Sequence, residues 1–194
     1  MLTRTTKGIK YNAKRCVTCG VCISVCPTKA LTSDYTYGKD KRICYDDSLC
    51  VNCGRCLSIC PAAYMDKILR PPSLDTNNTK SYIAWAKNSD VRFFAASGGV
   101  ARTLIKEASR QNFVDAIYSL YEADNDSMDI EGRWLVDSPD LLKIPASIYR
   151  PIFWGRALAA VNPQWKRVLI IGLPCQIRSA QLYFSKYWPG IKVF

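Results

Sequence analysis

The stretch that decides the fold of the N-terminal third is Cys16-Val17-Thr18-Cys19-Gly20-Val21-Cys22-Ile23-Ser24-Val25-Cys26-Pro27. Its four cysteines and its proline recur 34 positions later as Cys50, Cys53, Cys56, Cys60 and Pro61. The repeat extends upstream, because Ile9 and Tyr11 align with Ile43 and Tyr45. Each unit predicts a short strand, a cysteine-bearing loop and a helical turn after the fourth cysteine. Two such units predict pseudo-twofold symmetry.

The spacing C-x2-C-x2-C-x3-C-P is typical of iron–sulfur binding. Three thiolates on a tight loop can bind three corners of one iron–sulfur cube, whereas the fourth lies too far along the chain and ligates the other cluster. We therefore assign the eight cysteines to two 4Fe–4S clusters: Cys16, Cys19, Cys22 and Cys60 to the first, and Cys50, Cys53, Cys56 and Cys26 to the second.

Two other uses of these cysteines are less suitable. Zinc usually takes two separated C-x2-C pairs, and a disulfide framework needs an oxidising compartment, for which the sequence carries no signal. Cys44 occupies the place of Lys10 in the repeat, so we expect it to have no ligand role. Residues 8–65 resemble the bacterial two-cluster ferredoxins, and because cluster binding contributes to folding we expect the apoprotein to be largely unfolded here.

The composition of the 194 residues narrows the function classes. Histidine is absent, which excludes Cys–His zinc fingers, Rieske centres and histidine-based triads. The formal charge is +11, or roughly +7 once two clusters of about −2 each are bound, and it favours an acidic protein partner. Basic residues are scattered, so we expect no nucleic-acid binding. No apolar run could span a membrane and no signal segment is evident, so we expect a cytoplasmic protein.

The rest of the chain predicts an α/β domain. Residues 1–70 form the expected α+β ferredoxin-type domain, 71–80 a polar linker, and 81–194 the α/β domain, a mixed sheet with flanking helices. Its expected strands cover residues 81–86, 114–120, 134–136, 167–172 and 191–194. Its expected helices cover residues 100–111, 155–161 and 174–187, and Ser138-Pro139 opens a further short helix.

Two junctions in this domain could carry chemistry. At Ser97-Gly98-Gly99 the backbone could approach an anion such as a flavin phosphate, and the alternative is a plain tight turn. Cys175 lies at an expected helix N-terminus, a setting that favours a thiolate. It is a candidate redox thiol or metal ligand, and the alternative is a small buried residue.

Three segments together resemble the coenzyme F-420 hydrogenase/dehydrogenase beta-subunit family. They are Ser81-Tyr82-Ile83-Ala84-Trp85-Ala86-Lys87-Asn88, Ala96-Ser97-Gly98-Gly99-Val100 and the run from Lys166 to Ile177, where Leu173 replaces the threonine of the family's G-T-P-C-Q. Members often carry a two-cluster ferredoxin domain in front. The resemblance implies FAD near Ser97, Gly98 and Gly99, with Cys175 as a possible further cluster ligand.

The same resemblance implies a function. The chain would be an oxidoreductase subunit relaying electrons through two 4Fe–4S clusters to or from FAD and a two-electron carrier such as coenzyme F-420. Family members continue well past the G-T-P-C-Q motif, so the resemblance also implies an incomplete α/β domain, a fragment or split-gene product. A separate chain would then complete the flavin site. The alternative is a non-enzymatic carrier whose α/β part only docks a partner protein.

Overall fold

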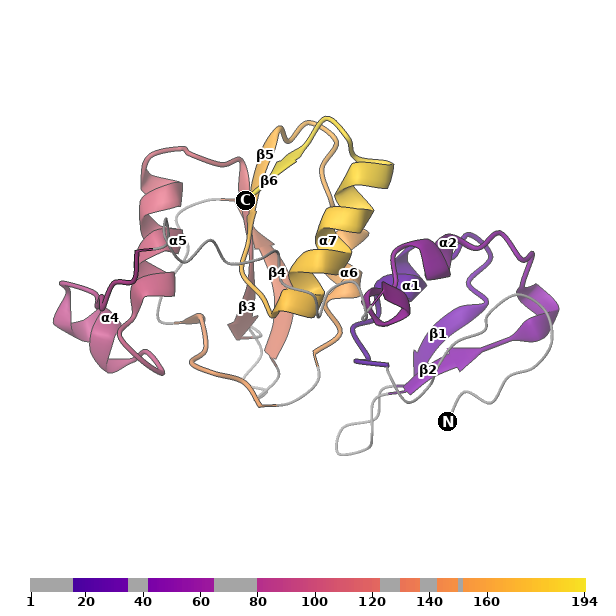
Figure 1. Cartoon of the computed structure of the whole chain (residues 1–194), viewed down its shortest axis with the longest axis horizontal. Helices are drawn as coiled ribbons and strands as arrows, with labels where there is room; N and C mark the ends of the chain where they lie inside the picture. Colours follow the sequence, from indigo (N-terminus) through magenta and orange to yellow (C-terminus); the bar gives the residue numbers. More distant parts are fainter. Residues whose placement is uncertain (1–15, 35–41, 65–79, 123–129, 137–142, 150–151) are drawn as a thin grey trace.

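The computed structural model describes residues 16–34, 42–64, 80–122, 130–136, 143–149 and 152–194. The expected strand at 9–11, most of the expected linker and the helix opened by Ser138-Pro139 lie outside these ranges. Figure 1 shows two units side by side, a smaller N-terminal one and a larger one built on a sheet.

The N-terminal unit is a pseudo-symmetric pair of cysteine loops beside a two-stranded sheet. The strands β1 (Leu31–Asp34) and β2 (Arg42–Tyr45) are antiparallel. The short helices α1 (Val21–Ser24) and α2 (Arg55–Ser58) each follow a glycine in the left-handed conformation, Gly20 with φ 76° and Gly54 with φ 69°. Two 3-10 turns, η2 (Asp47–Leu49) and η3 (Pro61–Tyr64), complete this unit.

The larger unit contains a four-stranded mixed sheet in the order β4-β3-β5-β6. Its strands are β3 (Ala116–Glu122), β4 (Ile130–Leu135), β5 (Arg167–Ile170) and β6 (Lys192–Val193). β4 is antiparallel to β3, whereas β3, β5 and β6 are mutually parallel. Asp115 holds the start of the β3–β5 pair, because its carboxylate accepts the N–H groups of Lys166 at 2.6 Å and Arg167 at 2.8 Å.

Helices cover both faces of this sheet. α5 (Val100–Arg110) lies on one face, where Ile105, Val114, Ile117 and Ile144 form a buried cluster. α6 (Gly155–Leu158) and α7 (Pro174–Tyr187) lie on the other (Figure 1). The alternation of Ile117 and Tyr118 between the two clusters follows from the period of a strand, whose successive side chains point to opposite faces. Among the described helices, none is both long and apolar enough to span a membrane.

The sequence predictions are confirmed for most of these elements. The expected helices at 174–187 and 100–111 correspond to α7 and α5, and the expected strands at 43–45, 114–120, 167–172 and 191–194 overlap β2, β3, β5 and β6. The expected strand at 134–136 is the end of a longer β4, and the helix expected at 155–161 is only the four residues of α6.

One expected strand is wrong. Residues 81–86 form no regular element, and Ile83 is 93% exposed. Apolar, β-branched and aromatic residues favour a strand only where a neighbouring strand is available, and here the backbone N–H of Ala86 donates instead to Gly98. The segment leads into α4 (Ser89–Phe93), a helix that was not predicted from the sequence. Asn88 is its N-cap, and the side-chain oxygen of Asn88 accepts the N–H groups of Asp90 and Val91.

The two units share one hydrophobic core. Val21, Val25 and Ile59 of the cysteine loops are buried in the same cluster as Trp154 of the larger unit. Further members of this cluster come from both helices on that face of the sheet: Ala157, Leu158, Ala180, Tyr183 and Phe184. The cysteine loops therefore pack on the sheet unit through buried apolar side chains as well as through surface contacts.

Candidate metal centres

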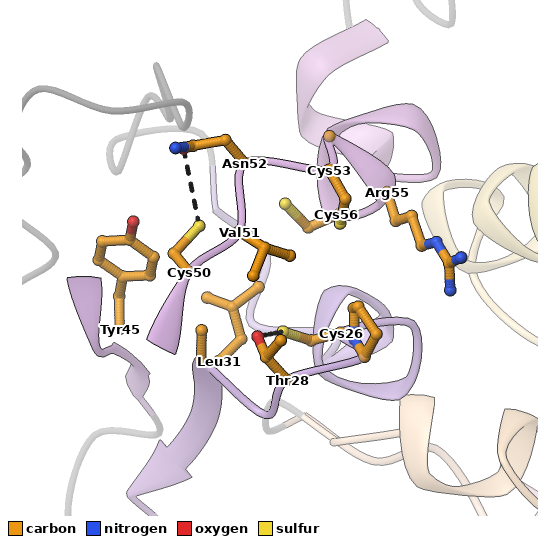
Figure 2. Close-up of a pocket in the computed structure, with 13 residues that line it drawn as sticks. Cys26, Thr28, Leu31, Tyr45, Cys50, Val51, Asn52, Cys53, Arg55 and Cys56 are labelled. Atoms are coloured by element: carbon orange, nitrogen blue, oxygen red, sulfur yellow. Dashed lines mark hydrogen bonds between the residues drawn. The ribbon is translucent and has the colours of Figure 1, made fainter. Parts of the chain in front are cut away.

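Eight of the ten cysteines line two pockets in the N-terminal unit. The first pocket is lined by Cys16, Cys19, Cys22 and Cys60. The second is lined by Cys26, Cys50, Cys53 and Cys56, which Figure 2 shows around a common space. Each pocket thus takes three thiols from one repeat and the fourth from the other, the same division that the repeat spacing predicts.

The donor chemistry of both pockets fits a 4Fe–4S cluster. Each pocket offers four thiols, the ligands that these clusters use. A single tetrahedral ion would require sulfur atoms roughly 3.8 Å apart, from Zn–S bonds of about 2.3 Å. Among the described residues, no three histidine, cysteine or acidic side chains are grouped for one ion. Four thiols that line one pocket suit the four iron corners of a cube.

Left-handed residues fold each loop around its thiols. Thr18 and Asn52, one repeat apart, have φ of 50° and 53°, and Gly20 and Gly54 follow two positions later. This sequence of conformations turns backbone N–H groups inward, and the N–H of Thr18 donates to the sulfur of Cys16 at 3.3 Å. Asparagine and glycine tolerate the left-handed region, so these residues reduce its cost in the second loop.

Burial strongly influences three thiols of the first pocket, those of Cys19, Cys22 and Cys60. The pKa of Cys19 is raised to about 12, mainly by burial. The N–H of Val21 lowers this pKa, and the nearby Cys60, Cys16 and Cys175 contribute to raising it. Burial also raises the pKa of Cys22 and of Cys60. Four thiolates here are costly without a compensating positive charge, which is what a bound metal supplies. Metal binding and deprotonation are therefore coupled at this pocket.

The second pocket is more open. Cys53 is exposed, and burial raises the pKa of Cys56. Cys26 behaves differently: burial raises its pKa, but the N–H of Leu31 and hydrogen bonds from Thr28 outweigh that effect and lower it. Figure 2 shows Thr28 beside Cys26 and Asn52 beside Cys50. The side-chain oxygen of each lies 3.8 Å from the cysteine sulfur.

The segment around Gly155 closes one side of the first cysteine loop. The N–H of Gly155 donates to the carbonyl of Cys19 at 3.1 Å, and the Ser24 hydroxyl donates to the carbonyl of Gly155 at 2.7 Å. A Cβ on Gly20 would lie 2.4 Å from the ring of Phe153. The sequence predicts a helix start at Gly155 but not this contact, because Ser24 and Gly155 are 131 positions apart and no local pattern signals their contact.

Two further cysteines lie outside both pockets. Cys44 is exposed in β2 opposite Thr32, and it lines neither pocket. Cys175 is in the first turn of α7, and it influences Cys19 electrostatically without lining the first pocket. Beside it, the N–H of Leu173 donates to the side-chain oxygen of Gln176 at 2.7 Å, which is half of a capping box.

The residues expected near a flavin lie at the start of α5. Gly99 has a φ of 75° and precedes the helix, and a Cβ there would lie 3.0 Å from the carbonyl oxygen of Val91. A Cβ on Gly98 would lie 2.9 Å from the carbonyl oxygen of Ala84, and Ser97 is exposed. Both glycines therefore make room for the chain's own backbone.

A buried cation lies in the first turn of the same helix. Arg102 is only 6% exposed, and its Nη2 donates to the carbonyl of Ile144. Its Nη1 is buried without a hydrogen-bond partner among the residues that the structure describes. The sequence analysis missed this residue, because an arginine on a helix usually lies in solvent.

Comparison with known proteins identifies the N-terminal unit. The model of the 4Fe-4S dicluster domain family matches residues 5–64. The N-terminal third is a 4Fe–4S dicluster domain. This iron–sulfur domain therefore contains all eight cysteines that line the two pockets.

The other comparisons are less extensive. A chain from the F-420-reducing NiFe hydrogenase complex of Methanosarcina barkeri, solved after xenon derivatisation, is 20% identical with a TM-score of 0.45. The match covers 54% of the present chain and 36% of the hydrogenase chain, so only about a third of that relative is represented. A search of curated protein sequences found no match.

Proposed function

We propose that this chain is an iron–sulfur oxidoreductase subunit or fragment that relays electrons between a partner protein and a flavin at the α/β unit. The observation that carries the proposal is the grouping of eight thiols into two neighbouring pockets, the first of which packs against the α/β unit. Each 4Fe–4S cluster, when bound, supplies a one-electron redox centre. Cys16, Cys19, Cys22 and Cys60 would hold one, and Cys26, Cys50, Cys53 and Cys56 the other.

The chain's own residues prepare the first pocket for this role. Gly155 and Phe153 cover one side of the loop around Gly20, which limits the access of water to the adjacent thiols. The backbone N–H groups of Thr18 and Val21 are directed at sulfur atoms and stabilise negative charge there. Cys175, in the first turn of α7, is close enough to Cys19 to raise its pKa, and there it would act as a redox thiol or as a ligand completed by another chain.

The flavin is proposed at the carboxyl edge of the parallel strands. Ligands of open α/β sheets bind outside the carboxyl ends of the strands, and Figure 1 shows the N-terminal ends of α5 and α7 on that side. The buried Arg102 supports an anionic ligand near α5, because its Nη1 has no partner among the described residues and a buried cation without a counter-charge is costly. FAD carries such charge on its phosphates, and coenzyme F-420 is the proposed two-electron substrate.

A second candidate function is a non-enzymatic electron carrier in the cytoplasm. The packing of Gly98 and Gly99 against the chain's own backbone favours it, because the turn then needs no ligand to explain its glycines. In this case the α/β unit only docks a partner protein. The cluster assignments are the same in both candidates.

One preparation distinguishes the two. The chain is purified anaerobically, reconstituted with iron and sulfide, incubated with FAD and desalted. We expect about eight irons and eight sulfides per chain. We also expect the chain to retain flavin, seen as absorbance at about 450 nm. Eight irons without flavin, even after a candidate second chain is added, would leave the carrier. Fewer than about four irons would contradict both.

A further inference from the structure

The two cysteine loops are equivalent in sequence but not in their surroundings. A Cβ on Gly20 would collide with the ring of Phe153, whereas a Cβ on Gly54, one repeat later, would meet nothing within 4 Å. Val17 is 37% exposed and its counterpart Val51 is 62% exposed. The larger unit therefore covers the first loop at Gly20, and within the described residues nothing covers Gly54 in this way, although α7 reaches the end of α2 through Lys186 and Ser58.

The residues on the open face differ in kind from those on the covered face. Val21 is fully buried in the shared core, and its counterpart one repeat later is the exposed Arg55. Val51 lines the second pocket with Arg55 and is exposed, and Leu49, two positions earlier in the chain, is exposed as well. An apolar centre with a charged rim is typical of a transient protein interface.

The charges around this face are mostly positive. Arg55 and Lys29 are exposed, and Lys186 extends from α7 to the Ser58 hydroxyl at 2.7 Å. Two carboxylates just before the face offset part of this charge: Asp46, which accepts the N–H of Ser48, and Asp47, which accepts the hydroxyl of Tyr45. Together with the net charge of +11, this pattern complements a negatively charged partner.

We propose that residues 49–55 are the docking face for an acidic one-electron carrier protein. The inference rests on the function proposed above, and it adds which of the two pockets meets the outside partner. Leu49 and Val51 would contact the apolar centre of the carrier's face, and Arg55 would pair with a carboxylate at its rim. On exchange the carrier loses or gains one electron and this chain gains or loses one, with no bond made and no proton moved.

The test measures binding separately from electron transfer. Oxidised flavodoxin, an acidic one-electron carrier, is titrated into the oxidised, iron-loaded chain, and Kd is measured at low and at high salt. Arg55→Glu is compared with Lys106→Glu, which makes the same charge change on the exposed side of α5. We expect Arg55→Glu to weaken binding about 10-fold and to flatten its salt dependence, and Lys106→Glu to change it less than about 2-fold.

A second variant tests the apolar centre. Val51→Asp should weaken binding by a similar factor, and in both variants an iron content of about eight shows that the domain is intact. Equal effects of Arg55→Glu and Lys106→Glu, or no binding of flavodoxin by the wild-type chain at low salt, would overturn the docking face. Failure of the proposed function is recognised separately, because the chain would then retain too little iron, or would keep its iron but no flavin after desalting.

Discussion

Gly155 packs directly on the backbone of Gly20, so closely that a Cβ on Gly155 would lie 2.4 Å from both the carbonyl carbon and the carbonyl oxygen of Gly20. The contact joins the start of α6 to the loop that carries Cys19 and Cys22. Because backbone atoms lie on both sides, neither partner can yield by a change of rotamer. The position of the α/β unit on the iron–sulfur domain therefore depends on the absence of a side chain at residue 155.

Gly155→Ala should disturb this junction. We expect a loss of about 1–3 kcal/mol, as for other overpacked sites, because the added methyl must push the segment away from Gly20. The apparent thermal midpoint of the iron-loaded chain measures this loss. Gly190→Ala is the matched control: a Cβ there meets nothing within 4 Å, and we expect a change within about 0.5 kcal/mol. Equal midpoints for the two variants would show that the junction is loose.

Leu173→Thr should stabilise the chain. Gln176 already accepts the N–H of Leu173, and a threonine hydroxyl at the N-cap would complete the reciprocal half of the capping box. Leu173 is 64% exposed, so little buried apolar surface is lost. We expect a gain of about 0.5–1 kcal/mol in thermal unfolding. Leu173→Val, with the same shape as threonine but no hydroxyl, should show no gain. If both variants behaved alike, capping would not be the cause.

The crossed cysteine assignment can be tested by pairs of substitutions. Cys26→Ala should damage the same cluster as Cys50→Ala, although the two residues belong to different repeats, and the double variant should keep about four irons. Cys26→Ala combined with Cys16→Ala should lose both clusters. Iron analysis and electron paramagnetic resonance distinguish these results. Cys44→Ser should retain about eight irons, and a loss there would contradict the assignment.

Arg102→Met should have opposite effects on stability and on ligand binding. Arg102 is buried and its Nη1 has no partner among the described residues, so its removal should stabilise the flavin-free chain by about 1 kcal/mol and raise its thermal midpoint. It should also reduce the flavin retained after desalting. Lys106→Met, one turn further along α5 and exposed, should do neither. A destabilised Arg102→Met with normal flavin retention would assign the residue a purely structural role.

Asp115→Ala should weaken the start of the β3–β5 pair. The N–H groups of Lys166 and then Arg167 hold the pKa of Asp115 below its usual value, so the carboxylate stabilises the fold wherever it is ionised. We expect a loss of about 1 kcal/mol at neutral pH.

The pH dependence of this effect follows from the direction of the pKa shift. A lowered folded pKa gives stability that is present above the unfolded value of about 4 and is lost only as the pH falls through the folded value. The difference between wild type and Asp115→Ala should therefore stay constant from about pH 8 to about pH 5.5. A difference that shrank within this range would mean that another group is responsible.

Local signals in the sequence were sufficient where the determinants are local. Pro174 at the first turn of α7 and the cysteine spacing each act within a few residues, and the structure has the corresponding helix and pockets. Among the described residues, the helical turn expected after the fourth cysteine is present only in the second repeat, as η3, whereas α1 and α2 lie before the fourth cysteine and were not predicted. The strand expected at 81–86 failed because sheet formation depends on a distant partner. The cover of Gly20 by Phe153 and the burial of Arg102 depend on contacts across the fold, for which a single sequence offers no pattern.

The unequal cover of the two pockets has a consequence for reduction potentials. Each pocket supplies four thiols, so the ligands alone would not make the two midpoint reduction potentials differ. Each added electron makes a site more negative, and this costs more free energy where protein replaces water. The site of Cys19 and Cys22 should then have the lower midpoint, and an electron held by the chain should reside mainly beside Cys26 and Cys50. Electron transfer from the α/β unit toward the open face would then be thermodynamically favourable.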